Sequence, residues 1–324
     1  MVRTDSVNQT YVRKYEKLYR SKPASLVDVV HRFGDEEVCR DYLEKLRWPN
    51  GVVCPRCESV SVSEISTRHQ FDCNTCRFRF SVTSGTIFDN TKLPLWKWMA
   101  AAYLMLESKK SMSANQIKRT LGVTYKTAWH LCHRIREAME TVDDGPALFG
   151  IVEVDETLLA PRNKRWPERG REHGGIPKGV PRVWVVGAIQ RGGQVRLGYV
   201  TNVKRETLHA FIRKHTKPET EAIYTDALRS YLGIGDHDTR HEFVNHEAFQ
   251  WVVGDVHTNS IESVWGIFER ALMGAYHKIS LKHLDAYLQE LEFRFNNRKN
   301  QFMFRDLLRR ILMKGAVRYE ALTA

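Results

Sequence analysis

Four stretches decide the fold class of this chain: GIVEVD (residues 150–155), VWVVGAIQ (183–190), VRLGYVTNV (195–203) and EAIYTD (221–226). Each is rich in β-branched and aromatic residues, which favours a β-strand. We expect the first three to form an antiparallel meander, with a tight hairpin turn at Gly192 and Gly193. A predicted helix over residues 205–215 precedes the fourth stretch, so the fourth strand can lie parallel to the first.

The chain beyond the fourth stretch completes this pattern. A short apolar run surrounds Phe243, a loop covers residues 254–258, and a long helix is predicted from about Asn259. Three strands, a helix, a strand and a helix follow one another in the ribonuclease H-like fold. The sequence therefore predicts an α/β protein with a ribonuclease H-like domain, a mixed sheet with helices, over residues 147–300.

Three carboxylates fall at suggestive places in this predicted domain. Asp155 ends the first strand, Asp226 ends the fourth, and Glu262 lies in the first turn of the last helix, within HTNSIES (257–263). If the two strands are neighbours, both aspartates arrive at one sheet edge, and a first-turn glutamate can reach back over it. Converging carboxylates repel one another unless a hard cation such as Mg²⁺ binds them. Taken singly, each acid could instead cap a turn or a helix.

Four of the six cysteines form the pairs CPRC (54–57) and CNTC (73–76), with 15 residues between them. Two such turns can supply the four thiolates of a tetrahedral zinc site. Disulfides would require export, for which the N-terminus has no signal, and a redox motif would need only one pair. We expect one structural Zn²⁺ per chain, bound by Cys54, Cys57, Cys73 and Cys76.

Composition and charge narrow the class of protein. The 324 residues are 42% hydrophobic and 10% aromatic, which is typical of a globular protein and not of a disordered chain. Membrane helices need about 20 uninterrupted apolar residues, and none is present, so we expect a cytoplasmic protein without a membrane partner. The net charge of +12 is concentrated in residues 109–136 and 293–318. Clustered basic residues favour nucleic acid as the partner.

The first basic run has the pattern of a helix-turn-helix. Ser113 and Gln116 form a capping box, Gly122 can end the first helix, and Thr124 can cap a second helix that runs to about Met139. The alternative is an ordinary three-helix packing module, which shows the same pattern. The candidate DNA-contacting residues here are Lys118, Arg119, Tyr125, Lys126, Thr127, His130 and Arg134.

The predicted organisation has five parts. They are a helical lead-in (1–50), a zinc ribbon (51–82), a helix-turn-helix-like region (90–142), the ribonuclease H-like domain (147–300) and a basic C-terminal helix (301–324). The segment from 161 to 182 is a basic insertion between the first two strands. It could grip DNA or be a disordered surface insert.

Several motifs together resemble a known family. They are LRWPNG (46–51) with CPRC, VEVDET (152–157), IYTD (223–226), HTNSIES (257–263), GAYHKIS (274–280) and FRFNNR (293–298). They resemble the DDE transposases of bacterial insertion sequences. The subgroup that looks most similar carries a zinc ribbon and is the insertion-sequence fifteen-ninety-five (ISXO-like) family. The resemblance covers nearly the whole chain.

This resemblance implies a reaction and a site. Asp155, Asp226 and Glu262 match the catalytic triad that holds two Mg²⁺ ions, and Asn259 is the alternative third ligand. The family usually has Lys or Arg seven residues after the glutamate, whereas this chain has Glu269 there and Arg270 next to it. The implied activity is binding of terminal inverted repeats, cleavage of the ends and joining to target DNA. The implied partner is double-stranded DNA, bound by a homodimer or higher oligomer, with Arg270 among its contacts.

Two other functions fit parts of the sequence. A nuclease or resolvase of the same fold would keep the three acids but would not join strands. A zinc-ribbon regulator without catalysis would share the N-terminal half. Such a regulator has no use for three converging acids, because without a metal they repel DNA.

Overall fold

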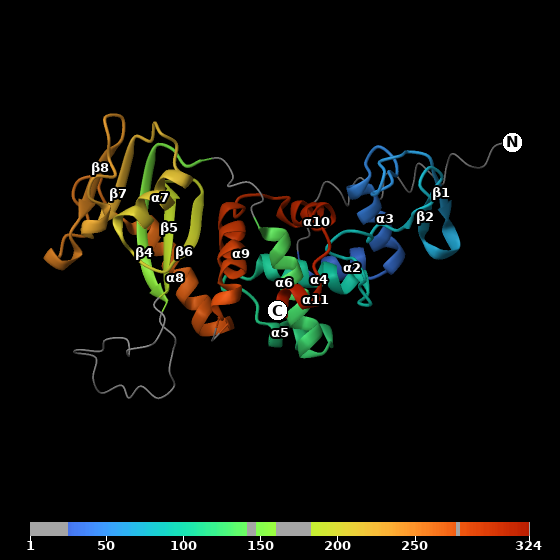
Figure 1. Cartoon of the computed structure of the whole chain (residues 1–324). Coiled ribbons are helices and arrows are strands. Elements are labelled where there is room, and N and C mark those ends of the chain that lie inside the picture. Colours follow the sequence, from blue (N-terminus) through green and yellow to red (C-terminus); the bar gives the residue numbers. More distant parts are fainter. Residues whose placement is uncertain (1–24, 141–146, 160–182, 277–278, 324) are drawn as a thin grey trace. The chain divides into compact units, whose positions relative to one another are not determined.

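The computed structural model describes residues 25–140, 147–159, 183–276 and 279–323. The predicted insertion at 161–182 lies outside these residues. The chain divides into two compact units, Met1–Met139 with Lys299–Ala324, and Glu140–Arg298. The five parts predicted from the sequence thus fall into two units, which are described separately below (Figure 1).

The unit Glu140–Arg298 is built on a five-stranded sheet. Its strands are β4 (Ile151–Leu159), β5 (Val183–Gln190), β6 (Val195–Val200), β7 (Ala222–Asp226) and β8 (Arg240–Val244). Their order is β6-β5-β4-β7-β8. The pairs β4–β5 and β5–β6 are antiparallel, and the pairs β4–β7 and β7–β8 are parallel. This confirms the predicted meander, the parallel fourth strand and the ribonuclease H-like fold class.

Helices cover both faces of this sheet (Figure 1). On one face lies α7 (Arg205–His215), and on the other lie α8 (Asn259–Ala271) and α9 (Leu284–Asn296). Side chains alternate between the faces of a strand, and in β5 Val186 packs with the α7 core whereas Val185 packs with the core of α8 and α9. Both faces are buried, which explains the nearly continuous apolar run of β5.

Side chains of α9 cover the edge of β6 that has no neighbouring strand. Asn296 Oδ1 accepts the N–H of Val195 at 2.8 Å, and its Nδ2 donates to the Val195 carbonyl at 3.0 Å. Glu292 Oε2 accepts the Leu197 N–H at 2.9 Å. These side chains replace a neighbouring strand and protect the edge from pairing with another chain. This accounts for part of the FRFNNR motif.

The hairpin between β5 and β6 differs from the predicted two-residue turn. The Gln190 N–H donates to Gln194 O and the Gly193 N–H donates to Gln190 O, each at 2.9 Å. The loop therefore has three residues and begins at Arg191, whose own N–H donates to Ile151 O at 3.0 Å. Gly192 has a φ of +72°, a conformation that favours glycine.

The other unit contains the ribbon and most of the remaining helices. Its ribbon strands are β1 (Val62–Ile65), β2 (Gln70–Cys73) and β3 (Arg79–Phe80). Its helices are α2 (Leu26–Phe33), α3 (Glu36–Arg47), α4 (Leu95–Glu107), α5 (Ala114–Leu121), α6 (Tyr125–Met139), α10 (Met303–Met313) and α11 (Tyr319–Thr323). The predicted caps are present, since Ser113 Oγ accepts the Gln116 N–H at 3.1 Å and Thr124 Oγ1 accepts the Thr127 N–H at 3.2 Å. Gly122 ends α5 with a φ of +61°.

The C-terminal segment differs from the single basic helix predicted at 301–324. It forms two helices, and α10 packs against α3, α4 and α6. Leu307, Leu308 and Ile311 of α10 are fully buried, and the Ile87 N–H donates to Ile311 O at 3.2 Å. The physical reason is that α10 has an apolar stripe at helical spacing, which must be covered. Within the described residues, no helix is long and apolar enough to span a membrane.

Candidate functional site

The four predicted zinc ligands come together. Their Sγ atoms all lie within 4.8 Å of one another, with Cys54 and Cys76 at 3.7 Å and Cys57 and Cys73 at 3.5 Å. The two CxxC turns have matching backbones, because the Glu58 N–H donates to Cys54 O and the Arg77 N–H donates to Cys73 O, each at 2.9 Å. Both turns therefore aim their thiols at one point.

This cluster fits a tetrahedral zinc ion. Zn–S bonds of about 2.3 Å place sulfurs about 3.8 Å apart, close to the distances in this cluster. All four cysteines are free thiols, so disulfides do not hold the ribbon. The Cys76 N–H donates to Cys73 Sγ at 3.4 Å, and this hydrogen bond is the largest of several that lower the pKa of the Cys73 thiol, while the pKa of the neighbouring Cys57 thiol is raised. A lowered pKa favours the thiolate form that binds metal.

Asp155 and Asp226 lie side by side, although one of them is not where the sequence predicted. Asp226 ends β7, but Asp155 lies in the middle of β4, because pairing with β5 continues as far as Leu159 opposite Val183. The parallel register sets Glu153 opposite Tyr224. Two residues further along each strand, Asp155 stands beside Asp226 on the same face of the sheet.

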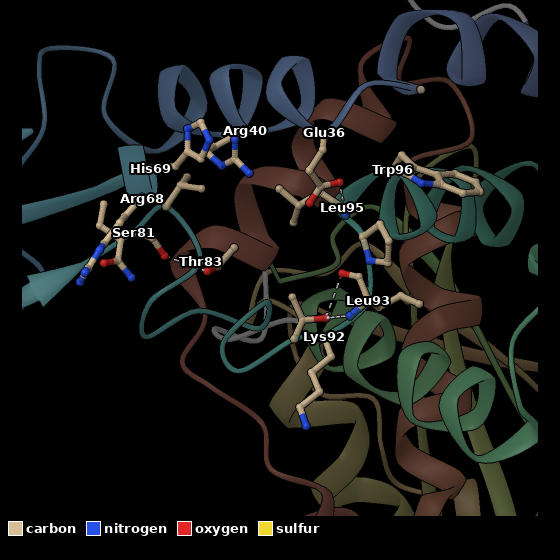
Figure 2. Close-up of a pocket in the computed structure, with 15 residues that line it drawn as sticks. Glu36, Arg40, Arg68, His69, Ser81, Thr83, Lys92, Leu93, Leu95 and Trp96 are labelled. Carbon is tan, nitrogen blue, oxygen red and sulfur yellow. Dashed lines mark hydrogen bonds between the residues drawn. The ribbon is translucent and has the colours of Figure 1, made fainter. Parts of the chain in front are cut away.

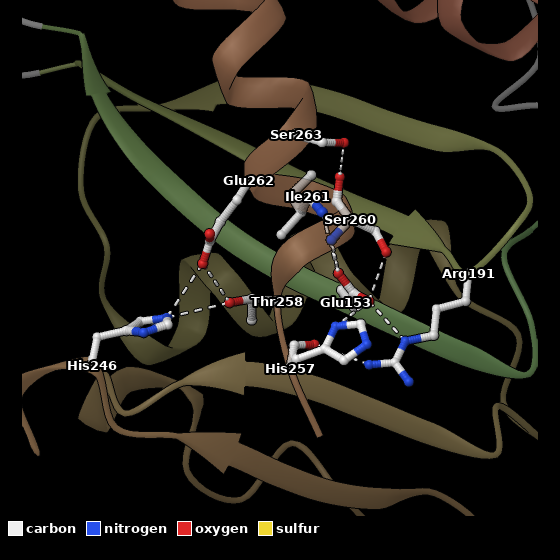
Figure 3. Close-up of polar contacts among 9 residues, drawn as sticks. All are labelled: Glu153, Arg191, His246, His257, Thr258, Ser260, Ile261, Glu262 and Ser263. Carbon is white, nitrogen blue, oxygen red and sulfur yellow. Dashed lines mark hydrogen bonds and ion pairs between the residues drawn. The ribbon is translucent and has the colours of Figure 1, made fainter. Parts of the chain in front are cut away.

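Glu262 approaches this face from α8. It is the fourth residue of the helix, and its side chain is 45% exposed. Its Oε1 accepts the Thr258 hydroxyl at 3.0 Å and lies 3.4 Å from His246 Nε2 (Figure 3). Asp155 is tied to the same helix, because Trp265 Nε1 donates to its Oδ2 at 2.9 Å.

The electrostatics of the aspartates favour a cation. Burial raises the pKa of Asp155 to about 7, and the charges of Asp226 and Glu262 act in the same direction, against the Trp265 hydrogen bond. Burial also raises the pKa of Asp226, although the Leu228 N–H, at 3.0 Å from its Oδ1, opposes this. The carboxylates thus repel one another in a partly dehydrated place, which a divalent cation would relieve.

The donor set fits Mg²⁺ in kind, since all three groups supply hard oxygen ligands. Among the described residues, however, only the cysteines have ligand atoms gathered closely enough to form a metal cluster. The Glu262 carboxylate is held by Thr258 and His246. A metal bound by all three acids would require the Glu262 side chain to rotate away from these partners.

Sequence reasoning missed Glu153, which fastens α8 to the sheet. Its side chain is fully buried, and it accepts hydrogen bonds from Ser260 N at 2.7 Å, Ser260 Oγ at 2.9 Å and Ile261 N at 3.2 Å (Figure 3). Arg191 Nε donates to it at 2.7 Å. The carboxylate therefore accepts hydrogen bonds from the otherwise unpaired N–H groups at the start of α8. Its negative charge also interacts favourably with the positive end of the helix dipole. The signal was an acid inside the apolar run GIVEVD.

Gly187 is a second missed residue. It stands opposite Asp155 in β5. A Cβ at this position would lie 2.7 Å from Ile261 Cδ1 and 2.8 Å from Trp265 Cη2, so only glycine allows α8 to approach this closely. The close approach brings the Trp265 indole to Asp155. The signal was a glycine inside a strand, which often marks a close contact.

The predicted DNA contacts differ in exposure. Lys118, Arg119, Tyr125 and Lys126 are exposed, and Thr127 and His130 are half-buried. Arg270 and Asn259 of α8 are also exposed.

The prediction is wrong for Arg134. This residue is 5% exposed, and its guanidinium donates to Asp89 O at 2.8 Å and to Ile87 O, and lies over the Trp98 ring at 5.0 Å. One turn after His130, this face of α6 enters the core, which a run of basic residues does not reveal.

Comparisons with known proteins agree with this architecture. Residues 147–296 match the model of the ISXO2-like transposase domain, and residues 34–79 match that of the transposase zinc-ribbon domain. An uncharacterised protein in transposable element ISH50 of Halobacterium salinarum is 28% identical over 276 residues, covering 82% of this chain and 92% of that protein. An uncharacterised transposase-like protein of Haemophilus influenzae is 34% identical over 98 residues, covering 30% of this chain and 77% of that protein.

Among solved structures, the crystal structure of the Mos1 strand transfer complex covers 97% of this chain and 96% of its own, with a TM-score of 0.28 and 11% identity. That likeness is too low to carry an argument. The family models and the relatives suffice: this chain belongs to the IS1595 (ISXO2-like) family of insertion-sequence transposases, with a zinc ribbon ahead of the transposase domain.

Proposed function

We propose that this transposase binds the terminal inverted repeats of its own element, cleaves the ends and joins them to target DNA in a Mg²⁺-dependent reaction. One observation carries the proposal. Asp155 and Asp226 stand side by side on neighbouring parallel strands, beneath the first turn of α8 with Glu262, and burial raises the pKa of both aspartates. Perturbed carboxylates of this kind are typical of catalytic sites.

The chain's own residues would position the reaction. When bound, two Mg²⁺ ions held by the three acids supply Lewis acidity toward the attacking hydroxyl and the leaving oxygen. Trp265 orients Asp155, the Leu228 N–H orients Asp226, and Glu153 holds the helix that carries Glu262. Cleavage and joining are both attacks of a hydroxyl on a phosphodiester, so one site can serve both.

Binding of the ends would fall to the other unit. The zinc ribbon and the exposed basic residues of α5 and α6, Lys118, Arg119 and Lys126, supply positive charge for the DNA backbone. Double-stranded DNA is the proposed partner, and a homodimer or higher oligomer on DNA the proposed assembly. One structural Zn²⁺ per chain completes the proposal.

The test is Asp226→Asn, which removes charge at nearly unchanged volume. With a labelled duplex carrying the element's end and Mg²⁺, we expect cleavage and joining to fall together by about 10²–10³ or more, with DNA affinity retained. Glu269→Gln on α8 is the matched control and should be mild. Cleavage and joining at the wild-type rate in Asp226→Asn would refute the assignment.

A second comparison tests the third ligand. We expect Glu262→Gln to be inactive and Asn259→Ala to retain most activity. The reverse result would assign the third ligand to Asn259, one helical turn before Glu262. The same assay distinguishes the two alternative functions. A nuclease would cut the duplex but would not join a precut end with a free 3′-hydroxyl to target DNA. A regulator would not cut the duplex at all.

A further inference from the structure

A hollow of about 660 Å³ lies in the ribbon-containing unit, and none of its lining residues belongs to the unit with the three carboxylates (Figure 2). It is bounded by α3, by the turn between β1 and β2, by the residues after β3, and by the segment that leads into α4. Its lining is mostly polar and basic. None of the residues that line the hollow was among the DNA contacts predicted from the sequence.

The hollow presents basic side chains from three separate parts of the chain. Arg40 comes from α3, Arg68 and His69 come from the turn after β1, and Lys92 precedes α4. Figure 2 shows Arg40 and His69 next to each other at its border. Within the described part of the chain, Arg40, Arg68 and Lys92 form no salt bridge, although the charge of Arg40 acts on Glu44 and that of Arg68 on Asp72.

Some acceptors of the hollow are already hydrogen-bonded within the unit. Among the described residues, Glu36 is the only acid in the lining, and its Oε2 accepts the Leu95 N–H at 2.8 Å, which caps the start of α4. Thr91 Oγ1 accepts the N–H of Leu93 at 3.1 Å and the Trp98 indole at 3.0 Å. The lining adds the donors of Arg40, Arg68 and Lys92 to these groups, which suits a ligand that accepts hydrogen bonds.

The walls are fixed before any ligand arrives. Arg47 donates to Ser81 O at 3.3 Å and to Val82 O at 2.8 Å, which joins α3 to the end of the ribbon. His69 has a φ of +50°, an uncommon conformation for a residue other than glycine, and its N–H donates to Ser66 O at 3.2 Å. The backbone positions from which Arg40 and Arg68 project are thus fixed, which lowers the cost of binding.

We propose that this hollow seats the sugar–phosphate backbone of the DNA end, with Arg40, Arg68 and Lys92 donating to phosphate oxygens. Phosphodiester oxygens accept hydrogen bonds and carry negative charge, as the donor set requires. The volume exceeds that of one phosphate, which fits a short run of backbone. The proposal rests on the proposed function in taking DNA as the partner. It adds which surface of the unit the DNA occupies.

The experiment measures fluorescence anisotropy with the full chain and two 30-base-pair duplexes, one carrying the element's end and one of arbitrary sequence. We expect Arg40→Gln, Arg68→Gln and Lys92→Gln each to weaken binding of both duplexes severalfold. Each substitution should also reduce, by about 1, the slope of the logarithm of the DNA association constant against the logarithm of the salt concentration. The reason is that each substitution removes a phosphate contact. Arg309→Gln on α10, which removes an exposed charge outside the hollow, is the matched control. Zinc content and thermal unfolding confirm that each variant is folded.

Three results distinguish the possible failures. Hollow variants that bind DNA like Arg309→Gln, while the wild type still binds and cleaves the element's end, would overturn this proposal and leave the proposed function standing. A wild type that binds neither duplex would refute both. Binding of inorganic phosphate to the wild type but not to the hollow variants, measured by calorimetry, together with unchanged DNA affinity in the variants, would overturn this proposal and make the hollow a small-anion site instead.

Discussion

Glu153 and Asp155 are two acids on the same face of one strand, and their surroundings give them opposite roles. Glu153 receives hydrogen bonds from Arg191, Ser260 and Ile261, so its charge is compensated inside the protein. Asp155 receives one side-chain hydrogen bond, from Trp265, and burial raises its pKa to about 7. The first carboxylate holds structure together, whereas the second is available to a cation.

The role of Glu153 predicts a large loss of stability on substitution. In Glu153→Gln the neutral amide cannot compensate Arg191, and its NH₂ group faces other donors. Losing one partner of a buried ion pair costs about 3–5 kcal/mol. We expect a loss in that range in the free energy of unfolding, measured with urea. Glu156→Gln is the control, because burial raises the pKa of Glu156 to about 7 and a neutral side chain there should cost less. Equal losses would contradict the assignment.

The raised pKa of Asp155 predicts a pH dependence of stability. The ordinary pKa of Asp in an unfolded chain is about 4. Between that value and about 7, folded Asp155 binds a proton that the unfolded chain does not. Without added divalent cation, the free energy of unfolding should therefore fall as pH rises from about 4 to about 7, by a few kcal/mol at most.

Thermal unfolding of the wild type and Asp155→Asn at pH 5.5 and pH 8 checks this. The variant should lose less stability between the two values, because Asn does not titrate. Added Mg²⁺ at pH 8 should stabilise the wild type more than the variant. A pH dependence that is the same in both proteins would refute the prediction.

At the scale of elements, the seating of α8 on the sheet sets how near Glu262 can come to the two aspartates. The helix carries Glu262 and Trp265, while the sheet carries both aspartates. Two contacts set the distance between them. Glu153 holds the first turn of the helix, and Gly187 leaves room for Ile261 and Trp265.

Gly187→Ala tests this seating. The added methyl would overlap the side chains of Ile261 and Trp265, both buried residues of α8, so these side chains and the helix that carries them must adjust, at a cost of about 1–3 kcal/mol. We expect lower stability together with a lower cleavage rate, because this adjustment separates Glu262 from the aspartates.

Gly198→Ala in β6 is the control. Its Cβ would meet only the ring edge of Phe211, at 3.0 Å, which can move. A Gly187→Ala variant as stable and active as Gly198→Ala would show that the seating does not depend on this glycine.

At the scale of the whole molecule, described segments from before and after the unit Glu140–Arg298 build one core. Helix α10 buries five apolar side chains in the unit that also contains the ribbon: Phe304, Leu307, Leu308, Ile311 and Leu312. Burying such side chains stabilises a fold by about 1.5–3 kcal/mol each, and their sum is comparable to the whole stability of a typical domain. The ribbon-containing unit therefore depends on residues that follow the unit Glu140–Arg298 in the sequence.

This dependence predicts the behaviour of truncated chains. A chain ending at Gly145 should not fold cooperatively, whereas the same chain joined by a flexible linker to residues 299–324 should. Circular dichroism during heating and limited proteolysis provide the measurement. A sharp unfolding transition in the shorter chain, at the temperature of the linked one, would contradict the shared core.

Much of the fold followed from local patterns. The strands, the helix caps at Ser113 and Thr124, the zinc cluster and the parallel fourth strand depend on residues close together in sequence or on simple topology. A cap needs only its own first turn, and a CxxC pair needs only its own loop. Such features can be predicted because their partners are a few residues away.

The sequence by itself thus determined the elements, the cysteine site and the strands that carry the two aspartates. Tertiary structure decided that Asp155 lies within β4, that Arg134 is buried, that Glu153 holds α8 and that α10 joins the ribbon-containing unit. Each of these depends on a partner far away in the chain, such as Leu159 opposite Val183 or Glu153 with Ser260. Burial and pairing of this kind arise only when distant segments meet, and no local pattern encodes them.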